Sequence, residues 1–378
     1  MHGDGLTGDV LVVAGESSGD LHAGALVREL RRLAPGLRVV AMGGPRLREA
    51  GAEILLEMAE VQTMGTTEAL RALGRLRNAY RFLRGFLESR RPRLVILVDF
   101  PEFNLRLAAR AKRAGVHVFY FVGPQVWAWR RGRVRKVVRY VDRLAVVFPF
   151  EPSFYNGRRE IATFVGHPLL DLARPTRPPD ATRRLYGLSP GKPLLAILPG
   201  SREGEIRAHL PPMLEAARRL SAGGWEAVVA FAPWVGRERA VRWSGGCAAA
   251  CGDTFDVLCA AQGALVASGT ATLEAALARV PAVVVYRANL LTYALGRLLV
   301  RVPYLAMPNL LLGRELYPEL LQSRVTAENM IRALEDVVAR RAELEGGFDE
   351  VRGRLGRPGA ARRAAELALD LLRRGGTA

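Results

Sequence analysis

The segment VLVVAGESSGD, residues 10–20, joins an uninterrupted apolar run to a turn that contains two glycines. The five apolar residues from Val10 to Ala14 are typical of a strand buried on both faces of a parallel sheet. The turn leads into an amphipathic helical pattern over residues 21–33. The segment therefore predicts a strand, a tight turn and a helix, which together are the repeating unit of a doubly wound α/β domain.

The same unit recurs along the rest of the chain. Further apolar runs, separated by helical patterns, lie at residues 37–42, 94–98, 117–122, 143–147, 194–198, 227–231, 264–267 and 282–286. A polar stretch with three prolines at residues 171–188 divides them into two groups. We therefore predict an α/β protein with two doubly wound, Rossmann-like domains that face each other across a cleft.

The expected domain bounds follow from this division. Residues 1–175 form the N-terminal domain and residues 176–345 the C-terminal domain, and residues 346–378 form a helical tail that packs back towards the first domain. Ligands of such sheets bind at the carboxyl ends of the strands, so candidate site residues are sought there.

The composition is that of an ordinary globular protein, with 49% hydrophobic and 24% charged residues among 378. The three cysteines, Cys247, Cys251 and Cys259, form no Cys-x-x-Cys pair and have no histidine nearby, which argues against a disulfide framework or a zinc site. The sequence also lacks a clustered Asp-x-Asp. We therefore expect neither a required metal nor another cofactor.

The sequence predicts neither a leader nor a membrane-spanning segment. The N-terminus carries no basic-then-apolar leader, and no run reaches the roughly 18 apolar residues that a spanning helix needs. The longest apolar region, residues 289–312, is interrupted by two arginines and two prolines. The expectation is a cytoplasmic protein that is soluble or peripheral.

The net charge of +18 is unevenly distributed. Residues 66–140 hold 18 Lys and Arg against 4 Asp and Glu. Such clustering predicts an anionic partner, either nucleic acid or an anionic bilayer.

Two strand ends in the first half carry candidate site residues. The residues after the first predicted strand are Gly15, Glu16, Ser18, Gly19 and Asp20. They precede or open a helix, whose free N–H groups suit an anion. Their Gly-x-x-x-Gly spacing is not the dinucleotide fingerprint, so the loop is either part of a ligand cleft or an ordinary turn.

The predicted strand at residues 94–98 is followed by Asp99 and, five residues later, Asn104. A carboxylate at such a strand end can act as the general base that takes a proton from an attacking hydroxyl. The alternative is that Asp99 or Asn104 caps the next helix. The residues alone leave both readings open.

Two strand ends in the second half suggest a nucleotide-diphosphate site. The candidates are Gly200, Ser201 and Arg202 after residues 194–198, and Ser268, Gly269, Thr270 and Glu274 after residues 264–267. Backbone N–H groups, a hydroxyl and a guanidinium suit phosphates, and Glu274 could accept hydrogen bonds from ribose hydroxyls. The spacing is not that of a P-loop NTPase. Without a metal, Arg202 and the helix N-termini would have to stabilise the negative charge on the leaving group.

At these positions the chain resembles the lipid-A-disaccharide synthase family, bacterial inverting glycosyltransferases with the GT-B fold. The matching blocks, in family order, are AGESSGD (14–20), DFPEFN (99–104), GPQVWAWR (123–130), FPFE (148–151), FVGHP (164–168), LPGSR (198–202), SGTATLE (268–274) and PNLL (308–311). They span nearly the whole chain. Residues 239–256 match no block of the family.

The resemblance implies a hexosyltransferase of lipid A and lipopolysaccharide biosynthesis. UDP-2,3-diacylglucosamine donates its sugar to the 6-hydroxyl of 2,3-diacylglucosamine 1-phosphate, giving a β-1,6-linked tetraacyl disaccharide 1-phosphate and UDP. Asp99 becomes the base and Arg202 the diphosphate clamp. The other donor-site residues would be Gly200, Ser201, Ser268, Gly269, Thr270, Glu274 and Asn309. The expected place of action is the cytoplasmic face of the inner membrane, and a homodimer is one conceivable assembly.

A helical pattern over residues 68–88 offers a membrane contact. Leucines and one tyrosine recur at steps of three and four residues, with arginines interleaved; the proposed contact residues are Leu73, Leu76, Arg77, Tyr80, Arg81 and Arg84. Such a helix lies in a membrane interface. The alternative is a helix packed on the core with a solvated arginine face.

Two competing functions were weighed. Another GT-B enzyme of UDP-sugars, such as a transferase to a polyprenyl-linked acceptor or an epimerase, would share the UDP cradle and differ in its acceptor. A nucleic-acid-binding protein would use the basic segment, but the arginines alternate with leucines and no aromatic stacking platform is recognisable. We therefore expect no nucleic-acid partner.

Overall fold

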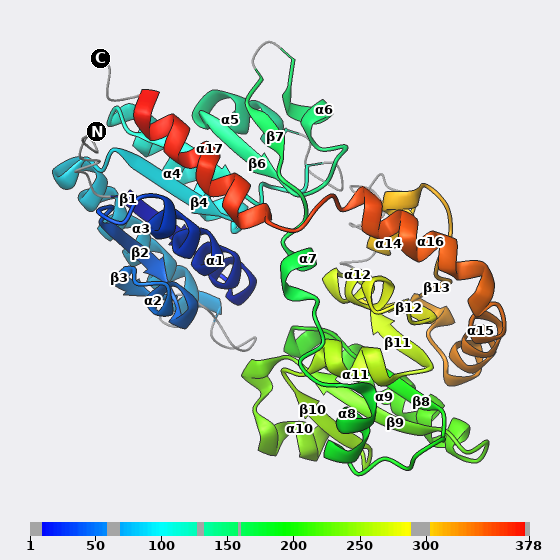
Figure 1. Ribbon diagram of the computed structural model, residues 1–378. Coiled ribbons are helices and arrows are strands. Elements are labelled where there is room, and N and C mark those ends of the chain that lie inside the picture. Colours follow the sequence, from blue (N-terminus) through cyan, green and yellow to red (C-terminus); the bar gives the residue numbers. More distant parts are fainter. Residues whose placement is uncertain (1–9, 59–68, 127–131, 158–159, 289–302, 375–378) are drawn as a thin grey trace. The chain divides into compact units, whose positions relative to one another are not determined.

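The computed structural model describes residues 10–58, 69–126, 132–157, 160–288 and 303–374, apart from the side chains of residues 69–73 (Figure 1). The chain divides into two compact units, the first comprising Met1–Pro168 with Leu355–Ala378 and the second Leu169–Arg354. None of the helices among the described residues is long and apolar enough to cross a membrane.

The first unit contains a seven-stranded sheet with the order β3-β2-β1-β4-β5-β6-β7, and all its strand pairs are parallel. The strands are β1 (Val10–Ala14), β2 (Val39–Gly43), β3 (Glu53–Glu57), β4 (Leu94–Val98), β5 (His117–Phe121), β6 (Arg143–Val146) and β7 (Ala162–Phe164). The order reverses between β1 and β4. The loops that follow these two strands therefore diverge and leave room for a ligand.

The helices of the first unit come from both ends of the chain. They are α1 (Ser17–Leu33), α2 (Pro45–Glu49), α3 (Ala69–Arg90), α4 (Pro101–Arg113), α5 (Arg133–Tyr140), α6 (Pro152–Tyr155) and α17 (Ala360–Arg374). Helix α17 packs against α1, β5 and β6, whereas α3 packs against α4. The last helix of the chain thus completes the cover of the first sheet.

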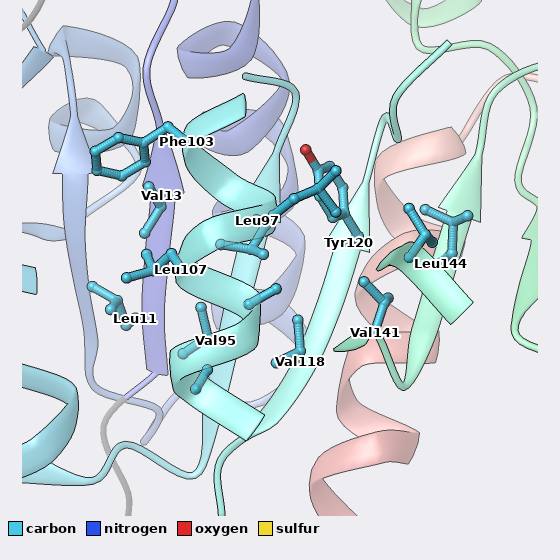
Figure 2. Close-up of a cluster of buried hydrophobic side chains, with 14 of the residues drawn as sticks. Leu11, Val13, Val95, Leu97, Phe103, Leu107, Val118, Tyr120, Val141 and Leu144 are labelled. Carbon is cyan, nitrogen blue, oxygen red and sulfur yellow. The ribbon is translucent and has the colours of Figure 1, made fainter. Parts of the chain in front are cut away.

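Continuous apolar runs explain the core of this unit. Every residue of β1 and β4 is buried, as expected for central parallel strands. Figure 2 shows side chains of β1, β4 and β5 facing α4, which contributes Phe103 and Leu107. The period of 3.6 residues in α4 places these two side chains on the same face of the helix.

The second unit contains a six-stranded sheet with the order β10-β9-β8-β11-β12-β13, and its pairs are also all parallel. The strands are β8 (Leu194–Leu198), β9 (Glu226–Phe231), β10 (Ala248–Cys251), β11 (Gly263–Ala267), β12 (Ala282–Tyr286) and β13 (Glu319–Leu321). The order reverses between β8 and β11, where the candidate donor loops begin.

The helices of the second unit are α7 (Leu169–Leu172), α8 (Pro179–Leu185), α9 (Glu203–Ser221), α10 (Arg237–Trp243), α11 (Thr254–Ala260), α12 (Thr270–Leu277), α14 (Met307–Leu312), α15 (Ala327–Ala339) and α16 (Arg341–Arg354), with short 3-10 turns η3 (Pro233–Val235) and η4 (Gln322–Arg324). The unit begins before the predicted bound at residue 176, because α7 is already part of it. It extends beyond residue 345, because α16 packs on α12 and α14 and its Glu345 and Asp349 pair with Arg279.

Candidate active site

The loops that follow β1, β4 and β5 begin at one level of the first sheet. Ala14 is the register partner of Val98, and Val98 is the partner of Phe121. The next residues, Gly15 and Asp99, therefore start their loops side by side at the carboxyl edge. The fold thus brings together the two strand ends that the sequence singled out in the first half.

Asp99 begins its loop in a strained backbone conformation. Its φ angle is 50°, that of Phe100 is 48°, and that of Val122 after β5 is 55°. Left-handed backbone at a residue other than glycine costs about 1–3 kcal/mol and clusters at functional sites. Three such residues lie at two adjacent strand ends, which makes this edge a candidate functional site.

Hydrogen bonds hold the Asp99 main chain in that conformation. Its carbonyl oxygen accepts a bond of 2.6 Å from the Tyr120 hydroxyl and one of 2.7 Å from Asn104 Nδ2. The Asn104 amide also donates to the carbonyl of Val98 at 3.3 Å, and both donor side chains are fully buried. A rigid backbone therefore carries the half-buried Asp99 side chain.

The capping alternative receives no support at this helix. Phe100, rather than Asp99 or Asn104, stands at the N-cap position of α4. Asn104 is committed to the main chain of Val98 and Asp99, so it supports the candidate base instead of offering its amide N–H groups to an acceptor.

Tyr120 was not recognised from the sequence, because its role depends on β5 lying beside β4. Burial, and after it the negative charge of Asp99, raises the pKa of Tyr120 well above its ordinary value. The phenol therefore remains a protonated donor to the Asp99 carbonyl at neutral pH.

The predicted acceptor loop divides into structural and accessible residues. A Cβ atom at Gly15 would lie 2.3 Å from the Phe100 ring, so glycine is needed for that ring to pack there. The buried Asp20 carboxylate accepts N–H bonds from Gly44 at 2.7 Å and from Arg46 at 2.9 Å. Asp20 therefore fixes the start of α2.

Of the other residues in this loop, Gly19 is buried, Glu16 is half-buried and Ser18 is exposed. A Cβ atom at Gly19 would be in ordinary contact with the Val98 carbonyl oxygen, at 3.5 Å. Glu16 and Ser18 are thus the polar side chains of the predicted set that solvent, and hence an acceptor, can reach.

In the second unit, the phosphate cradle predicted at residues 200–202 is already occupied by a carboxylate of the protein, that of Glu205. Glu205 Oε2 accepts the N–H groups of Ser201 at 2.9 Å and Arg202 at 3.3 Å, and Glu205 also pairs with the Arg202 guanidinium at 3.4 Å. Gly200 has a φ of 125°, and a Cβ atom there would lie 2.7 Å from Glu205. The glycine thus allows a capping box at α9.

This arrangement modifies the prediction for residues 200–202. The main-chain N–H groups of Ser201 and Arg202 already have an anionic partner, whereas the Arg202 side chain is 71% exposed. The exposed guanidinium is therefore the part of this loop best suited to an external phosphate.

The second predicted cradle, at α12, is open. Its N-cap residue is Gly269, with a φ of 146°, and the structure describes no capping side-chain bond there. A Cβ atom at Gly269 would meet no heavy atom within 4 Å. Thr270 is exposed, while the Ser268 hydroxyl is committed to the Leu305 carbonyl at 2.9 Å. The α12 N-terminus can therefore receive an anion.

Glu274 lies one turn further along α12. Burial raises the pKa of its carboxyl group to about 7. Within the described part of the chain, this half-buried carboxylate has no hydrogen-bond or ion-pair partner. An acceptor of this kind, close to an anion-binding helix end, fits a pair of ribose hydroxyls.

Asn309 is fully occupied by the protein. Its Nδ2 donates to the Tyr317 carbonyl at 2.7 Å and to Glu319 at 3.0 Å, and its Oδ1 accepts from the N–H groups of Leu316 and Tyr317. The side chain is 0% exposed. Asn309 thus organises the segment around α14 and has no hydrogen-bonding capacity left for UDP.

Helix α3 places much of its apolar stripe in the core. Leu83 and Leu87 are fully buried, and Leu76 and Tyr80 pack against the same core cluster. The solvent side of the helix carries Arg77, Arg81 and Arg84 and Phe82, which is 46% exposed. The core-packed alternative thus accounts for the leucines, while the side chain of Leu73 lies outside the described residues.

Among the described residues, no three His, Cys, Asp or Glu side chains gather in a way that could hold a metal ion. The charged groups of the predicted donor loops include Arg202, Glu205 and Glu274, together with the α12 dipole.

Sequence comparisons give a consistent family. A family model described as lipid-A-disaccharide synthetase matches residues 10–345. The lipid-A-disaccharide synthase of Myxococcus xanthus is 46% identical over 372 residues, covering 96% of this chain and 97% of that protein. The one from Syntrophus aciditrophicus is 39% identical over 375 residues, covering 97% and 98%.

Comparison with solved structures gives the fold. A UDP-GlcNAc 2-epimerase from Neisseria meningitidis, bound to UDP-GlcNAc, matches with a TM-score of 0.64 and 11% identity, covering 97% of this chain and 100% of that one. The calicheamicin glycosyltransferase CalG4 matches with a TM-score of 0.61 and 18% identity, covering 98% and 99%. These identities speak for the fold alone, and they confirm the predicted GT-B class.

The structure thus has two parallel-sheet α/β units of the GT-B kind, each with candidate ligand loops where its strand order reverses. The relatives match over nearly their whole length. The chain is a glycosyltransferase and belongs to the lipid-A-disaccharide synthase family.

Proposed function

We propose that the protein transfers 2,3-diacylglucosamine from UDP-2,3-diacylglucosamine to the 6-hydroxyl of 2,3-diacylglucosamine 1-phosphate. The products are the β-1,6-linked tetraacyl disaccharide 1-phosphate and UDP. The observation that carries the proposal is Asp99, a carboxylate on a strained strand end whose carbonyl is held by Tyr120 and Asn104, in a chain of this family.

The chemistry follows from the two edges described above. Asp99 takes the proton of the acceptor 6-hydroxyl while that oxygen forms a bond to C1 of the donor sugar. The bond between C1 and the diphosphate oxygen breaks, and UDP leaves with its electron pair. Attack from the face opposite to the leaving group inverts the configuration at C1.

The second unit supplies the donor site in this proposal. The diphosphate lies at the open N-terminus of α12, where backbone N–H groups and the helix dipole stabilise the charge that develops on the leaving group. The exposed Arg202 guanidinium adds a second stabilising charge, and Glu274 binds the ribose hydroxyls. Cationic and backbone groups thereby take the role that a metal ion plays elsewhere.

Both proposed substrates carry acyl chains, so the enzyme acts where a bilayer presents them. We place it on the cytoplasmic face of the inner membrane, with the solvent side of α3 as a contact. Arg77, Arg81 and Arg84 are exposed there beside Phe82. Each arginine near an anionic surface contributes about 1 kcal/mol of attraction.

Mass spectrometry of the reaction products tests the proposal. The purified protein is mixed in detergent with UDP-2,3-diacylglucosamine and 2,3-diacylglucosamine 1-phosphate. We expect a tetraacyl disaccharide phosphate that accumulates in step with UDP. UDP binding without disaccharide would contradict the acceptor assignment. Epimerised donor sugar in place of disaccharide would favour the activity that the fold neighbours carry.

A further inference from the structure

His209 on α9 connects two loops at the carboxyl edge of the second sheet. Its Nδ1 lies 2.9 Å from the carbonyl oxygen of Pro199, directly after β8. Its Nε2 accepts the backbone N–H of Arg287, directly after β12, also at 2.9 Å. The side chain is 1% exposed. One imidazole therefore ties together two loops that are 88 residues apart along the chain.

These two loops flank the proposed diphosphate site. In the sheet, β8 and β12 lie on either side of β11, and β11 leads into the open N-terminus of α12. The loop after β8 carries Arg202, three residues beyond Pro199. The loop after β12 carries Arg287 itself. Each side of the α12 N-terminus is thus bordered by a loop with an arginine.

The hydrogen bonds fix the protonation of the ring. Because Nε2 accepts a backbone N–H, Nδ1 must carry the proton and donate to Pro199. Burial lowers the pKa of His209, which keeps this neutral form at physiological pH. The groups around the ring are Glu205, the Arg287 guanidinium and the Tyr286 ring, whose centroid lies 6.4 Å away.

Arg287 is available for a ligand. Its side chain is exposed and has no ion-pair partner among the described residues. The loop that carries it is also held from the other side, since the N–H of Ala288 donates to Gln322 Oε1 at 3.0 Å. The main chain thus fixes the point from which the Arg287 side chain extends, and its guanidinium can pair with an anionic ligand.

We propose that Arg287 binds the diphosphate of the nucleotide-sugar donor opposite Arg202, and that His209 is the positioning residue that holds both loops in register for this contact. The inference rests on the proposed function and extends it to residues that no motif of the sequence marked. Arg287 would touch the ligand, whereas His209 acts only through the two loops.

The test measures UDP affinity by calorimetry and thermal stability on the same samples. For Arg287→Ala we expect a loss of affinity of at least about tenfold, without a comparable change in melting temperature. The matched control is Arg332→Ala, an exposed arginine on α15 paired only with Glu328 of its own helix. It removes the same charge and should bind UDP like the parent.

For His209, two replacements each keep one of its two hydrogen bonds, either that to the Pro199 carbonyl or that from the Arg287 N–H. His209→Asn retains a donor near the Nδ1 position, His209→Gln an acceptor near the Nε2 position, and His209→Ala neither. We expect UDP affinity to fall in steps, least in Asn and Gln and by about tenfold or more in Ala. Met213→Ala empties a fully buried position further along α9 and should lose stability while keeping its UDP affinity.

Two results would overturn the inference while leaving the donor site standing: parent-like UDP affinity in Arg287→Ala, or equal losses in His209→Ala and Met213→Ala. If the parent itself fails to bind UDP, the proposed function fails, and the inference falls with it. The parent measurement therefore separates the two failures.

Discussion

At the scale of single residues, the proposed role of Glu274 in the donor site makes UDP binding depend on pH. Its folded-state pKa of about 7 means that roughly half of the molecules carry a protonated carboxyl at neutral pH. Ribose hydroxyls donate more strongly to the carboxylate than to the acid. UDP binding should therefore favour the deprotonated form and strengthen as pH rises through 7.

We predict that UDP binds roughly tenfold more tightly at pH 8 than at pH 6. The fraction of molecules with a deprotonated Glu274 rises from about one-tenth at pH 6 to about nine-tenths at pH 8. The Glu274→Gln variant supplies the baseline, since a phosphate also titrates near pH 6. Calorimetry at both pH values gives the comparison. An identical pH dependence in parent and variant would remove Glu274 from the ribose site.

The same pKa makes a stability prediction of fixed sign. The folded pKa lies above the unfolded value of about 4.3, so the folded state binds more protons between these values. Stability contributed by the protonated carboxyl is complete below pH 4.3 and is lost as pH rises to 7. Glu274→Gln should therefore be more stable than the parent at pH 8 and indistinguishable from it near pH 4.3, as read by urea unfolding.

Tyr120 makes a separate residue-scale prediction. Tyr120→Phe removes the 2.6 Å bond to the Asp99 carbonyl and leaves only Asn104 to hold that main chain. We expect kcat to fall about tenfold, with UDP affinity unchanged. Tyr317→Phe is the control, because its buried hydroxyl also donates to a backbone carbonyl, that of Val280 at 2.7 Å, in the other unit. Equal kcat in both variants would contradict a positioning role for Tyr120.

For buried polar residues, the sequence predicts the position but not the role. Asp20, Asn104 and Asn309 all stand in family blocks, and all three are buried and bonded to main chain. Their partners come from loops that only the folded chain brings near. A motif could therefore mark these positions without distinguishing a residue that touches ligand from one that shapes the loop behind it.

At the scale of elements, the continuous apolar runs were sufficient to predict the interior strands of both sheets. Each of the nine predicted strands forms an interior strand, and the four that were missed, β3, β7, β10 and β13, are the four edges. An edge strand is covered less completely, so it needs no continuous apolar run; β3, for example, contains no fully buried residue. Residues 239–256, which match no family block, contain the edge strand β10 and part of α10.

The N-terminus of α12, the proposed anion site, makes an element-scale prediction. If the diphosphate lies at α12, Gly269→Ala should weaken UDP binding beyond any loss of stability, because its Cβ atom enters the open space in front of the helix. Gly313→Ala is the control: this residue also has a positive φ, 72°, and open surroundings. Ala in its left-handed backbone costs about 1–2 kcal/mol, whereas Gly269, with φ 146° and ψ −161°, lies in a region almost confined to glycine. The thermal stability of both variants is therefore measured beside their UDP affinity. Equal UDP affinity in the two variants would place the anion elsewhere.

At the scale of the whole molecule, the net charge of +18 is concentrated in residues 66–140. Replacing Arg77, Arg81 and Arg84 of α3 by Ser should weaken binding to vesicles with anionic lipid by roughly tenfold to a hundredfold at low salt. The control removes equal charge from the second unit by replacing three of its exposed arginines with serine: Arg218, Arg332 and Arg340. Co-sedimentation should show a larger loss of vesicle binding in the α3 variant than in the control. Equal losses would mean that net charge alone, and not the position of the arginines on α3, determines binding.

We propose that Asp99 of the first unit performs the chemical step and that the second unit binds the donor. The most direct test compares turnover and UDP affinity in one Asp99→Asn sample, because the amide keeps the size of the side chain and removes its basicity. We expect a loss of turnover of at least about a hundredfold, with UDP affinity within about twofold of the parent. An Asp99→Asn enzyme with full turnover would contradict the central claim.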